Sequence, residues 1–181
     1  MQKKNHLHSG VLVWITGLPG SGKTTLAQAL YGLIKNQLPS ICIDGDIIRD
    51  IMGKDLGYNM KDRLKNAYRI AKLNKYLIDH NLIVICSTVS LFKEIHQWNR
   101  KNIKNLIEIY IDVPMDILIQ RDQKKMYSQA LKGKKKNVRG IDQKFDIPMK
   151  PSLIIKNDKN LNIFLENVKK INKLILKKYD K

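Results

Sequence analysis

Near its N-terminus the chain reads Gly17-Leu18-Pro19-Gly20-Ser21-Gly22-Lys23-Thr24, which matches the phosphate-binding pattern G-x-x-x-x-G-K-[ST]. The apolar run Val11–Ile15 precedes this stretch, and the helix-forming run Thr25–Leu30 follows it. Strand, glycine-rich loop and helix is the order that this P-loop motif needs, because backbone N–H groups of the loop and the helix N-terminus then face the phosphates. A glycine-rich turn that matches by chance is the alternative, and the flanking runs argue against it.

The motif predicts a site for a nucleoside triphosphate. In such a site Lys23 reaches the β- and γ-phosphates, and the Thr24 hydroxyl ligates Mg²⁺. The motif does not say which group receives the phosphate, so the acceptor has to be sought elsewhere in the chain.

Length and composition are those of one globular domain. The chain has 181 residues, 43% of them hydrophobic, and no apolar run is long enough to cross a membrane. We expect a single domain over residues 1–181, with a polar N-terminal arm over residues 1–10 that lacks the apolar core of a signal peptide. Cys42 and Cys86 lie in apolar runs without metal-ligand spacing, which favours buried, reduced thiols in a cytoplasmic protein. No membrane partner is expected.

The net charge of +18 comes almost entirely from lysine, because only six of the 34 basic residues are arginine. The lysines are spread along the chain, which is typical of a solvated surface with nonspecific affinity for polyanions. A dedicated nucleic-acid partner is therefore not expected, and a small anionic substrate suits the charge equally well. The few arginines indicate positions that need a planar, bidentate donor. Three of them, Arg49, Arg63 and Arg69, follow the P-loop unit closely.

Continuous apolar runs alternate with segments of helical periodicity along the chain. This pattern predicts an α/β fold in which a five-stranded parallel sheet is flanked by helices on both faces. The expected strands are Val11–Thr16, Ile41–Ile43, Leu82–Cys86, Ile107–Ile111 and Leu153–Ile155.

One charged segment, about residues 122–151, interrupts this alternation between the fourth and fifth expected strands. It holds many lysines, Gly133 and Gly140, Pro148 and Pro151, and few apolar residues that would anchor it. In a phosphotransferase such a segment is typical of a mobile lid that excludes water from the triphosphate. A plain solvated loop is the alternative that composition leaves open.

Two carboxylates follow the second expected strand, at Asp44 and Asp46, and Arg49 comes three residues later. Ligands of open parallel sheets bind at the carboxyl ends of the strands, so both carboxylates are expected to face the phosphate site. Phosphoryl transfer to a hydroxyl needs Mg²⁺ and a group that orients or deprotonates the hydroxyl, and two carboxylates fit those two tasks. Asp46 as a helix N-cap is the alternative, which is compatible with catalysis. The third expected strand carries no acidic residue at its end, which gives Asp44 and Asp46 more weight.

A polar stripe is predicted on the helix that follows. Arg63, Asn66 and Arg69 are spaced three residues apart, so they share one helix face. Two arginines and an amide suit a phosphate or sulfate together with a ribose or base edge, and Tyr58 just before them suits stacking on a base. Ordinary surface polar residues on a helix are the alternative.

Together these motifs resemble the adenylylsulfate kinase family, from about Val13 to Lys156. The resemblance rests on four pieces of sequence, which are Trp14–Thr25, Asp44–Arg49, Asp55-Leu56-Gly57-Tyr58 with Asp62, Arg63, Asn66 and Arg69, and Arg121-Asp122 with Tyr127 and Gly140-Ile141-Asp142. It implies a P-loop NTPase fold of the nucleoside-kinase type, with residues 122–151 as the lid. It also implies transfer of the γ-phosphate of ATP to the 3′-hydroxyl of adenosine 5′-phosphosulfate, by a homodimer that uses Mg²⁺.

The resemblance assigns roles to individual residues. Lys23 and Asp46 are the expected catalytic residues, and Thr24 and Asp44 the expected metal ligands. ATP would be bound by Gly17, Leu18, Pro19, Gly20, Ser21, Gly22, Lys23, Thr24, Thr25 and Arg121. The acceptor nucleotide would be bound by Asp46, Arg49, Tyr58, Arg63, Asn66, Val89, Ser90, Lys136 and Val138. Ser90 also falls where some members carry a serine that is phosphorylated.

Two departures from the family pattern bear on the acceptor. The family commonly has Ser-Pro-Tyr-Arg where this chain has Ser90-Leu91-Phe92-Lys93, and the lid aromatic that closes over adenine appears here as Val138. Loss of one stacking face costs about 1–3 kcal/mol of base binding, so another base can compete. The stretch Ser90–Arg100 also resembles a branch linked to surface polysaccharides, one member of which phosphorylates the 3′-hydroxyl of cytidine diphosphoramidate. Adenosine 5′-phosphosulfate is the default acceptor, cytidine diphosphoramidate is the alternative, and a noncatalytic nucleotide-binding or nucleic-acid-binding module is the remote one.

Overall fold

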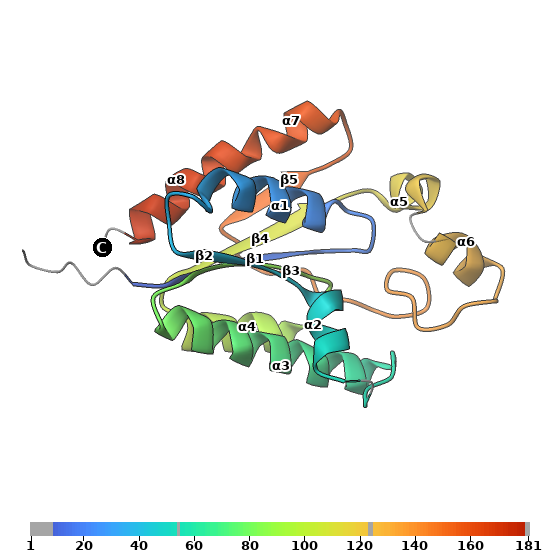
Figure 1. Ribbon diagram of the computed structural model, residues 1–181. Helices are drawn as coiled ribbons and strands as arrows, with labels where there is room; N and C mark the ends of the chain where they lie inside the picture. The colour runs from blue at the N-terminus through green and yellow to red at the C-terminus, as the bar shows by residue number, and fades with distance from the viewer. Residues whose placement is uncertain (1–8, 54, 123–124, 180–181) are drawn as a thin grey trace, which may run out of the picture.

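The computed structural model describes residues 9–53, 55–122 and 125–179. Its centre is a parallel sheet of five strands in the order β2-β3-β1-β4-β5, which confirms the predicted fold class (Figure 1). The strands are β1 (Val11–Gly17), β2 (Ser40–Asp44), β3 (Ile83–Thr88), β4 (Leu106–Asp112) and β5 (Leu153–Lys156). Each lies within two residues of its predicted bounds. Most of the predicted N-terminal arm, residues 1–8, lies outside the described residues.

Helices cover both faces of this sheet. The helices of the described residues are α1 (Lys23–Ile34), α2 (Gly45–Ile51), α3 (Met60–Asp79), α4 (Lys93–Asn102), α5 (Met115–Arg121), α6 (Met126–Leu131), α7 (Leu161–Leu165) and α8 (Asn167–Tyr179). Helices α1, α7 and α8 lie on one side of the sheet, and α3 and α4 lie on the other (Figure 1).

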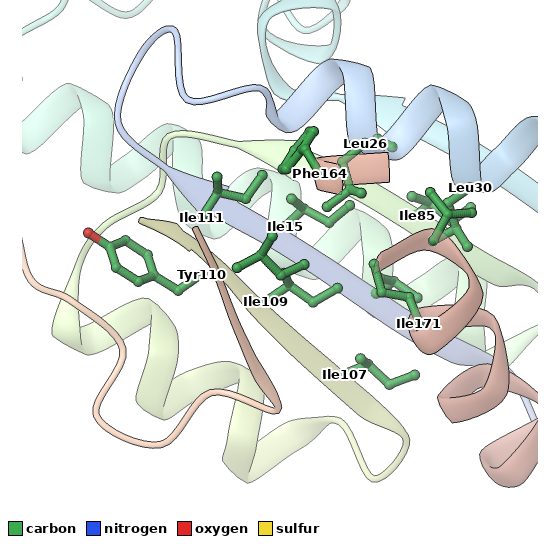
Figure 2. Packing of buried hydrophobic residues seen from close by; sticks show 14 of the residues in the cluster. Ile15, Leu26, Leu30, Ile85, Ile107, Ile109, Tyr110, Ile111, Phe164 and Ile171 are labelled. Atoms are coloured by element: carbon green, nitrogen blue, oxygen red, sulfur yellow. The ribbon is translucent and has the colours of Figure 1, made fainter. Parts of the chain in front are cut away.

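The central strand β1 shows how the sequence produces these layers. All seven of its residues are buried, and side chains along a strand point alternately to the two faces of its sheet. Val13 and Ile15 join the core beneath α1 and α8, whereas Leu12 and Trp14 join the core beneath α3 and α4. Figure 2 shows the first of these cores, where side chains of the strands meet Leu26 and Leu30 of α1 and Ile171 of α8. A continuous apolar run is therefore required, because both faces of the strand are covered.

The register of the sheet brings the carboxyl ends of the strands to one edge. Asp44 is paired with Ser87, and Gly17 with Ile111. The P-loop after β1, the acidic turn after β2 and the polar end of β3 thus lie side by side, although they are far apart in sequence. This is the edge at which open α/β sheets bind their ligands.

The lid segment, residues 122–151, is more firmly anchored than its composition predicts. The expectation that few apolar residues hold it is wrong, because the side chains of Tyr127 and Val138 are both 1% exposed and belong to the core beneath α1. The segment also contains a short helix, α6, and the Tyr127 hydroxyl donates to Pro19 O at 2.8 Å. One end of the segment is therefore tied directly to the P-loop. Residues 123 and 124 lie outside the described residues.

The two cysteines are free thiols, as predicted. The prediction that both are buried holds for Cys86 in β3 and is wrong for Cys42, which is half-buried on β2. Burial raises the pKa of Cys86 to about 12. In the part of the chain that the structure describes, no helix has the length and apolar character needed to cross a membrane.

Candidate active site at the carboxyl ends of the strands

The P-loop turns tightly between β1 and α1. Gly22 precedes α1 in the left-handed region, with a φ of 98°, and a Cβ at this position would lie 2.6 Å from Nδ2 of Asn157. Only glycine meets both conditions without strain. Lys23 begins the helix and its Nζ donates to Leu18 O at 2.8 Å, so the ammonium group lies across the mouth of the loop. The loop therefore has the form that the motif predicts for a phosphate site.

Asp44 connects the P-loop to the acidic turn. Its Oδ2 accepts from the Thr24 hydroxyl at 2.9 Å and from the Ser87 hydroxyl at 3.1 Å. Its Oδ1 accepts from Asp46 N–H at 2.9 Å, so Asp44 caps helix α2. The alternative in which Asp46 is the cap is therefore wrong. The cap fixes Asp46 in the first turn of α2, where its side chain is exposed beside the phosphate site.

The oxygen atoms around Thr24 and Asp44 suit Mg²⁺. This ion prefers hard oxygen ligands and usually takes one or two from the protein and the rest from phosphates and water. A hydroxyl and a carboxylate oxygen 2.9 Å apart next to the P-loop supply such a partial set. Among the described residues, no group of three or more His, Cys, Asp or Glu residues can hold a metal by itself. The donor set therefore fits an ion shared with a nucleotide and not a closed protein cage.

A second cluster, formed by Arg49, Tyr58 and Arg63, lies beyond the acidic turn. The guanidinium carbons of Arg49 and Arg63 are 4.3 Å and 5.3 Å from the centre of the Tyr58 ring. Arg49 donates to Leu56 O at 2.7 Å and also to Gly57 O, which fixes the loop that carries Tyr58. The Tyr58 side chain itself is exposed. An aromatic ring flanked by two cations suits a nucleotide, whose base stacks and whose anionic groups pair with the arginines.

Arg63 also joins this cluster to the lid segment. Its Nε donates to Tyr58 O and its Nη2 donates to Asn137 O, both at 2.9 Å. Burial, followed by repulsion from Arg49, lowers the pKa of Arg63. The two like charges next to each other favour an anionic ligand between them, since such a ligand removes the repulsion.

The predicted stripe on α3 divides into two parts. Arg69 forms a bidentate pair with Asp55, with nitrogen–oxygen distances of 2.8 Å and 2.5 Å, so it fixes the loop before α3. Asn66 is 8% exposed, and its Oδ1 has no hydrogen-bond partner among the described residues. A buried acceptor of this kind is unusual in folded proteins, and it marks Asn66 as the member of the stripe that has an unused polar atom near Arg63.

The structure places the other predicted residues in different surroundings. Arg121 donates to Asn157 O at 2.7 Å, and Asn157 donates to Ser21 O at 2.9 Å, so both are linked to the P-loop. Lys136 is exposed on the lid segment and Val89 is half-buried at the end of β3. Ser90 is 4% exposed and its hydroxyl is 2.8 Å from that of Thr88. A hydroxyl buried in this way is not presented to a modifying enzyme in this structure.

Val138 is not presented to the acceptor cluster either, because it packs in the core beneath α1. The chain turns immediately before it, where Asn137 has a φ of 65° and its N–H donates to Asp142 at 2.6 Å. This turn directs the Asn137 carbonyl toward Arg63 and the Val138 side chain inward. The expected contact between Val138 and the base therefore requires a different arrangement of the lid segment.

The sequence prediction missed Asn157, Arg139 and Gln143, which have polar contacts at or beside this site. Asn157 directly follows β5. Its position at the carboxyl end of a strand is the sequence feature from which it could have been predicted. Arg139 is one of the six arginines and is 1% exposed, with its guanidinium carbon 3.9 Å from the centre of the Phe92 ring. Its placement inside a lysine-rich segment was the available signal.

Comparison with known proteins agrees with this geometry. The chain matches the family model for adenylylsulphate kinase over residues 9–156. It is 44% identical over 153 residues to the cytidine diphosphoramidate kinase of Campylobacter jejuni, covering 84% of this chain and 89% of that protein. It is 36% identical over 151 residues to the adenylyl-sulfate kinase of Chloroflexus aurantiacus, covering 83% and 81% of the two chains.

Solved structures show the same relationship. The structure of the Mycobacterium tuberculosis APS kinase in complex with AMPPNP and APS matches with a TM-score of 0.84 and 28% identity, covering 93% of this chain and 98% of that one. The P-loop, the acidic turn and the match of the family model over most of the chain identify it as a nucleotide-binding phosphotransferase, a kinase that belongs to the adenylylsulfate kinase family.

Proposed function

We propose that this protein transfers the γ-phosphate of ATP to the 3′-hydroxyl of an activated 5′-nucleotide. The observation that carries the proposal is the adjacency of two clusters. Thr24 and Asp44 are in hydrogen-bond contact, Asp46 follows in the next turn, and Arg49 and Tyr58 lie just beyond. A triphosphate on the P-loop and a nucleotide on the arginine cluster would thus meet at Asp46.

The chemistry of this transfer divides among a few side chains. Lys23 neutralises charge on the β- and γ-phosphates and keeps the triphosphate in line with its acceptor. Asp46 orients the 3′-hydroxyl and takes its proton as the new oxygen–phosphorus bond forms. Thr24 and Asp44 would hold Mg²⁺, which when bound neutralises charge on the phosphate oxygens. The lid segment, tied to the P-loop through Tyr127, would exclude water from the triphosphate.

For the acceptor we place cytidine diphosphoramidate first and adenosine 5′-phosphosulfate second. The relative from Campylobacter jejuni shares 44% of residues with this chain, against 36% for the adenylyl-sulfate kinase of Chloroflexus aurantiacus. Both acceptors present a base, a ribose and an anionic group beyond the 5′-phosphate, which suits Tyr58 flanked by Arg49 and Arg63. By the same reasoning the enzyme would work in polysaccharide modification in the first case and in sulfate assimilation in the second. A homodimer and a cytoplasmic location remain proposals from the family resemblance.

The test is ADP release with MgATP and either acceptor, with ³¹P NMR of the products. We expect a 3′-phosphorylated product and a kcat/KM for cytidine diphosphoramidate at least about tenfold above that for adenosine 5′-phosphosulfate. A preference for the adenine acceptor would assign the enzyme to sulfate activation. Turnover of neither acceptor, or phosphate on any other atom, would contradict the proposed reaction.

A further inference from the structure

The guanidinium of Arg139 is buried, yet only part of it is bonded to the protein. Its Nη1 donates to Leu91 O at 2.6 Å and to Lys144 O at 3.2 Å, which anchors the residue. Its Nε and Nη2 have no partner among the described residues, although the side chain is 1% exposed. Burial lowers the pKa of Arg139 to about 10, so the group stays charged at neutral pH. Two adjacent N–H donors are thus held in a fixed orientation without acceptors.

Gln143, the β-bridge partner of Arg139, supplies the opposite kind of atom. Arg139 and Gln143 form a β-bridge, which places their backbones side by side. The Gln143 Nε2 donates to Tyr58 O at 3.1 Å and to the Asn137 side-chain oxygen at 3.0 Å. A carbonyl oxygen can only accept, so these contacts fix the orientation of the amide and leave Oε1 as a buried acceptor with no partner among the described residues.

We propose that Arg139 and Gln143 read the hydrogen-bonding edge of a cytosine in the acceptor nucleotide. Cytosine presents two adjacent acceptors, O2 and N3, followed by an amino donor at C4. The fork of Arg139 would donate from Nε and Nη2 to O2 and N3, and Oε1 of Gln143 would accept from the amino group. This inference rests on the proposed function, which it deepens by naming the residues that read the base.

Other bases fit this pair of side chains less well. Adenine presents one acceptor, N1, beside its amino donor, so one nitrogen of the Arg139 fork stays unpaired. Uracil would place its N3–H donor against the N–H donors of Arg139 and its carbonyl against Oε1 of Gln143. A donor would then face donors, and an acceptor would face an acceptor. A buried polar group left without a partner costs more free energy than one hydrogen bond gains. A site of this kind therefore discriminates strongly between pyrimidines.

The position of the pair agrees with the rest of the acceptor cluster. Gln143 is bonded to the backbone of Tyr58, whose exposed ring is the predicted stacking surface. The edge of a base stacked there would face residues 137–143. Because both side chains are buried, the base reaches them only after residues 137–143 shift away from the Tyr58 loop. That shift breaks the bond from Gln143 to Tyr58 O, and the bond from Gln143 Nε2 to the Asn137 side chain, within the same segment, still fixes the orientation of the amide.

The experiment is calorimetric titration of the full-length protein, with an ATP analogue present, using cytidine, uridine and adenosine 5′-monophosphates and the cytidine analogue that lacks the 4-amino group. We expect the wild type to bind the cytidine nucleotide about 100-fold more tightly than the uridine nucleotide and about tenfold more tightly than the 4-deamino analogue. Gln143→Leu should bind the cytidine nucleotide and the 4-deamino analogue equally. Arg139→Lys should weaken cytidine binding by about 10- to 100-fold, because a point charge replaces the fork.

Controls separate base reading from charge and from folding. Lys150→Gln changes an exposed lysine of the lid segment, residues 122–151, and should leave all affinities unchanged. Thermal unfolding should be followed for every variant. If the Arg139→Lys variant unfolds, the proposal is tested on the wild type alone, by comparing its binding of the cytidine nucleotide with that of the 4-deamino analogue. Equal binding of cytidine and uridine nucleotides by the wild type would overturn the inference. Equal weakening of all three nucleotides by Arg139→Lys would also overturn it, because the arginine would then bind an anion.

The base inference and the proposed reaction can fail separately. Cytidine-selective binding without phosphorylation of either acceptor would contradict the reaction and keep the base assignment. Turnover at the 3′-hydroxyl with no preference for cytosine would keep the reaction and overturn the base assignment.

Discussion

The two halves of the candidate active site are built in different ways. The phosphate half is one continuous run, Gly17–Thr24, which a single strand and a single helix hold in place. The acceptor half takes side chains from α2, from the loop before α3, from α3 itself and from residues 137–143. Backbone donors serve any nucleoside triphosphate, whereas an assembly of side chains recognises one ligand. The proposed reaction and its proposed acceptor thus depend on different parts of the molecule.

The largest expected effect is on the phosphate half. Lys23→Ala should lower kcat by about 1000-fold or more, because a preorganised charge that faces the transferred phosphate is lost. ADP release with MgATP and the preferred acceptor measures it. Lys35→Ala, at the exposed C-cap of the same helix, is the matched control and should leave the rate unchanged. Near wild-type turnover by Lys23→Ala would remove the P-loop from the mechanism.

Asp46 stands where the two halves meet, and it is expected to have the next largest effect. Asp46→Asn should lower kcat by about 100- to 1000-fold with little change in the KM for ATP, because the proton acceptor is lost. Asp44 still caps α2 through the Asp46 backbone N–H, so circular dichroism should be unchanged. Asp50→Asn, an exposed carboxylate of the same helix, is the control. Unchanged kcat in Asp46→Asn would mean that another group takes the proton.

The sheet and the phosphate half could be predicted from sequence because their signals are local. Each strand is a continuous apolar run, and the P-loop is a fixed spacing of glycines, lysine and threonine. The acidic turn was also predictable, because Asp44 directly ends a strand whose carboxyl end must face the site. Even there the local detail was missed, since the cap of α2 is Asp44 and not Asp46.

The acceptor half could be predicted only in part, because its geometry depends on contacts between distant segments. Arg63 meets Asn137 across 74 positions of sequence, and Gln143 meets Tyr58 across 85. Contacts between residues so far apart leave no periodic pattern in the sequence. The same holds for Glu108, which is 2% exposed on β4 and bonded to His96 at 2.7 Å. His96 on α4 and Glu108 on β4 are 12 positions apart, so no helix or strand spacing predicts their contact.

The third prediction tests whether Val138 belongs to the acceptor half or to the core. Its side chain is fully packed, so Val138→Phe should cost about 1–3 kcal/mol of folding free energy through overpacking. That loss corresponds to a fall in Tm on the order of 5 °C for a protein of this size. Ile154→Phe, at an exposed position of β5, is the control for the added ring. An unchanged Tm together with improved use of an adenine acceptor would place the residue against the base, as the family resemblance implies.

A smaller effect is expected from Arg63, which touches only the acceptor half. Arg63→Lys should raise the acceptor KM by about tenfold, because the lysine cannot keep bonds to Tyr58 O and Asn137 O and also pair with an anion. The KM for ATP should stay within about twofold. Lys65→Arg, an exposed change on the same helix, is the reverse control. A rise confined to the KM for ATP would contradict the assignment of Arg63 to the acceptor.

The smallest effect concerns the loop that carries Tyr58. The hydrogen bond from Arg69 lowers the pKa of Asp55 to about 2, below its usual value of about 3.9. A carboxyl with a lowered folded-state pKa stabilises the protein above about pH 4, and this stabilisation is lost as the pH falls through about 2. Asp55→Asn should therefore lower Tm slightly at pH 6, and the difference from the wild type should shrink between about pH 4 and pH 2. Asp55 is solvent-exposed and Arg69 is partly exposed, so the effect is small and should weaken with added salt.

Thermal unfolding at several pH values measures this difference, with Asp79→Asn as the matched control, since it breaks the exposed Lys75–Asp79 pair at the other end of α3. A difference in Tm that stays constant down to about pH 2 would contradict the assigned pKa. The same two variants also sharpen the comparison between the halves of the site. If Asp55→Asn raises the acceptor KM and Asp79→Asn does not, the Arg69–Asp55 pair acts by holding the Tyr58 loop, and α3 contributes to acceptor binding through loop position as well as through Arg63.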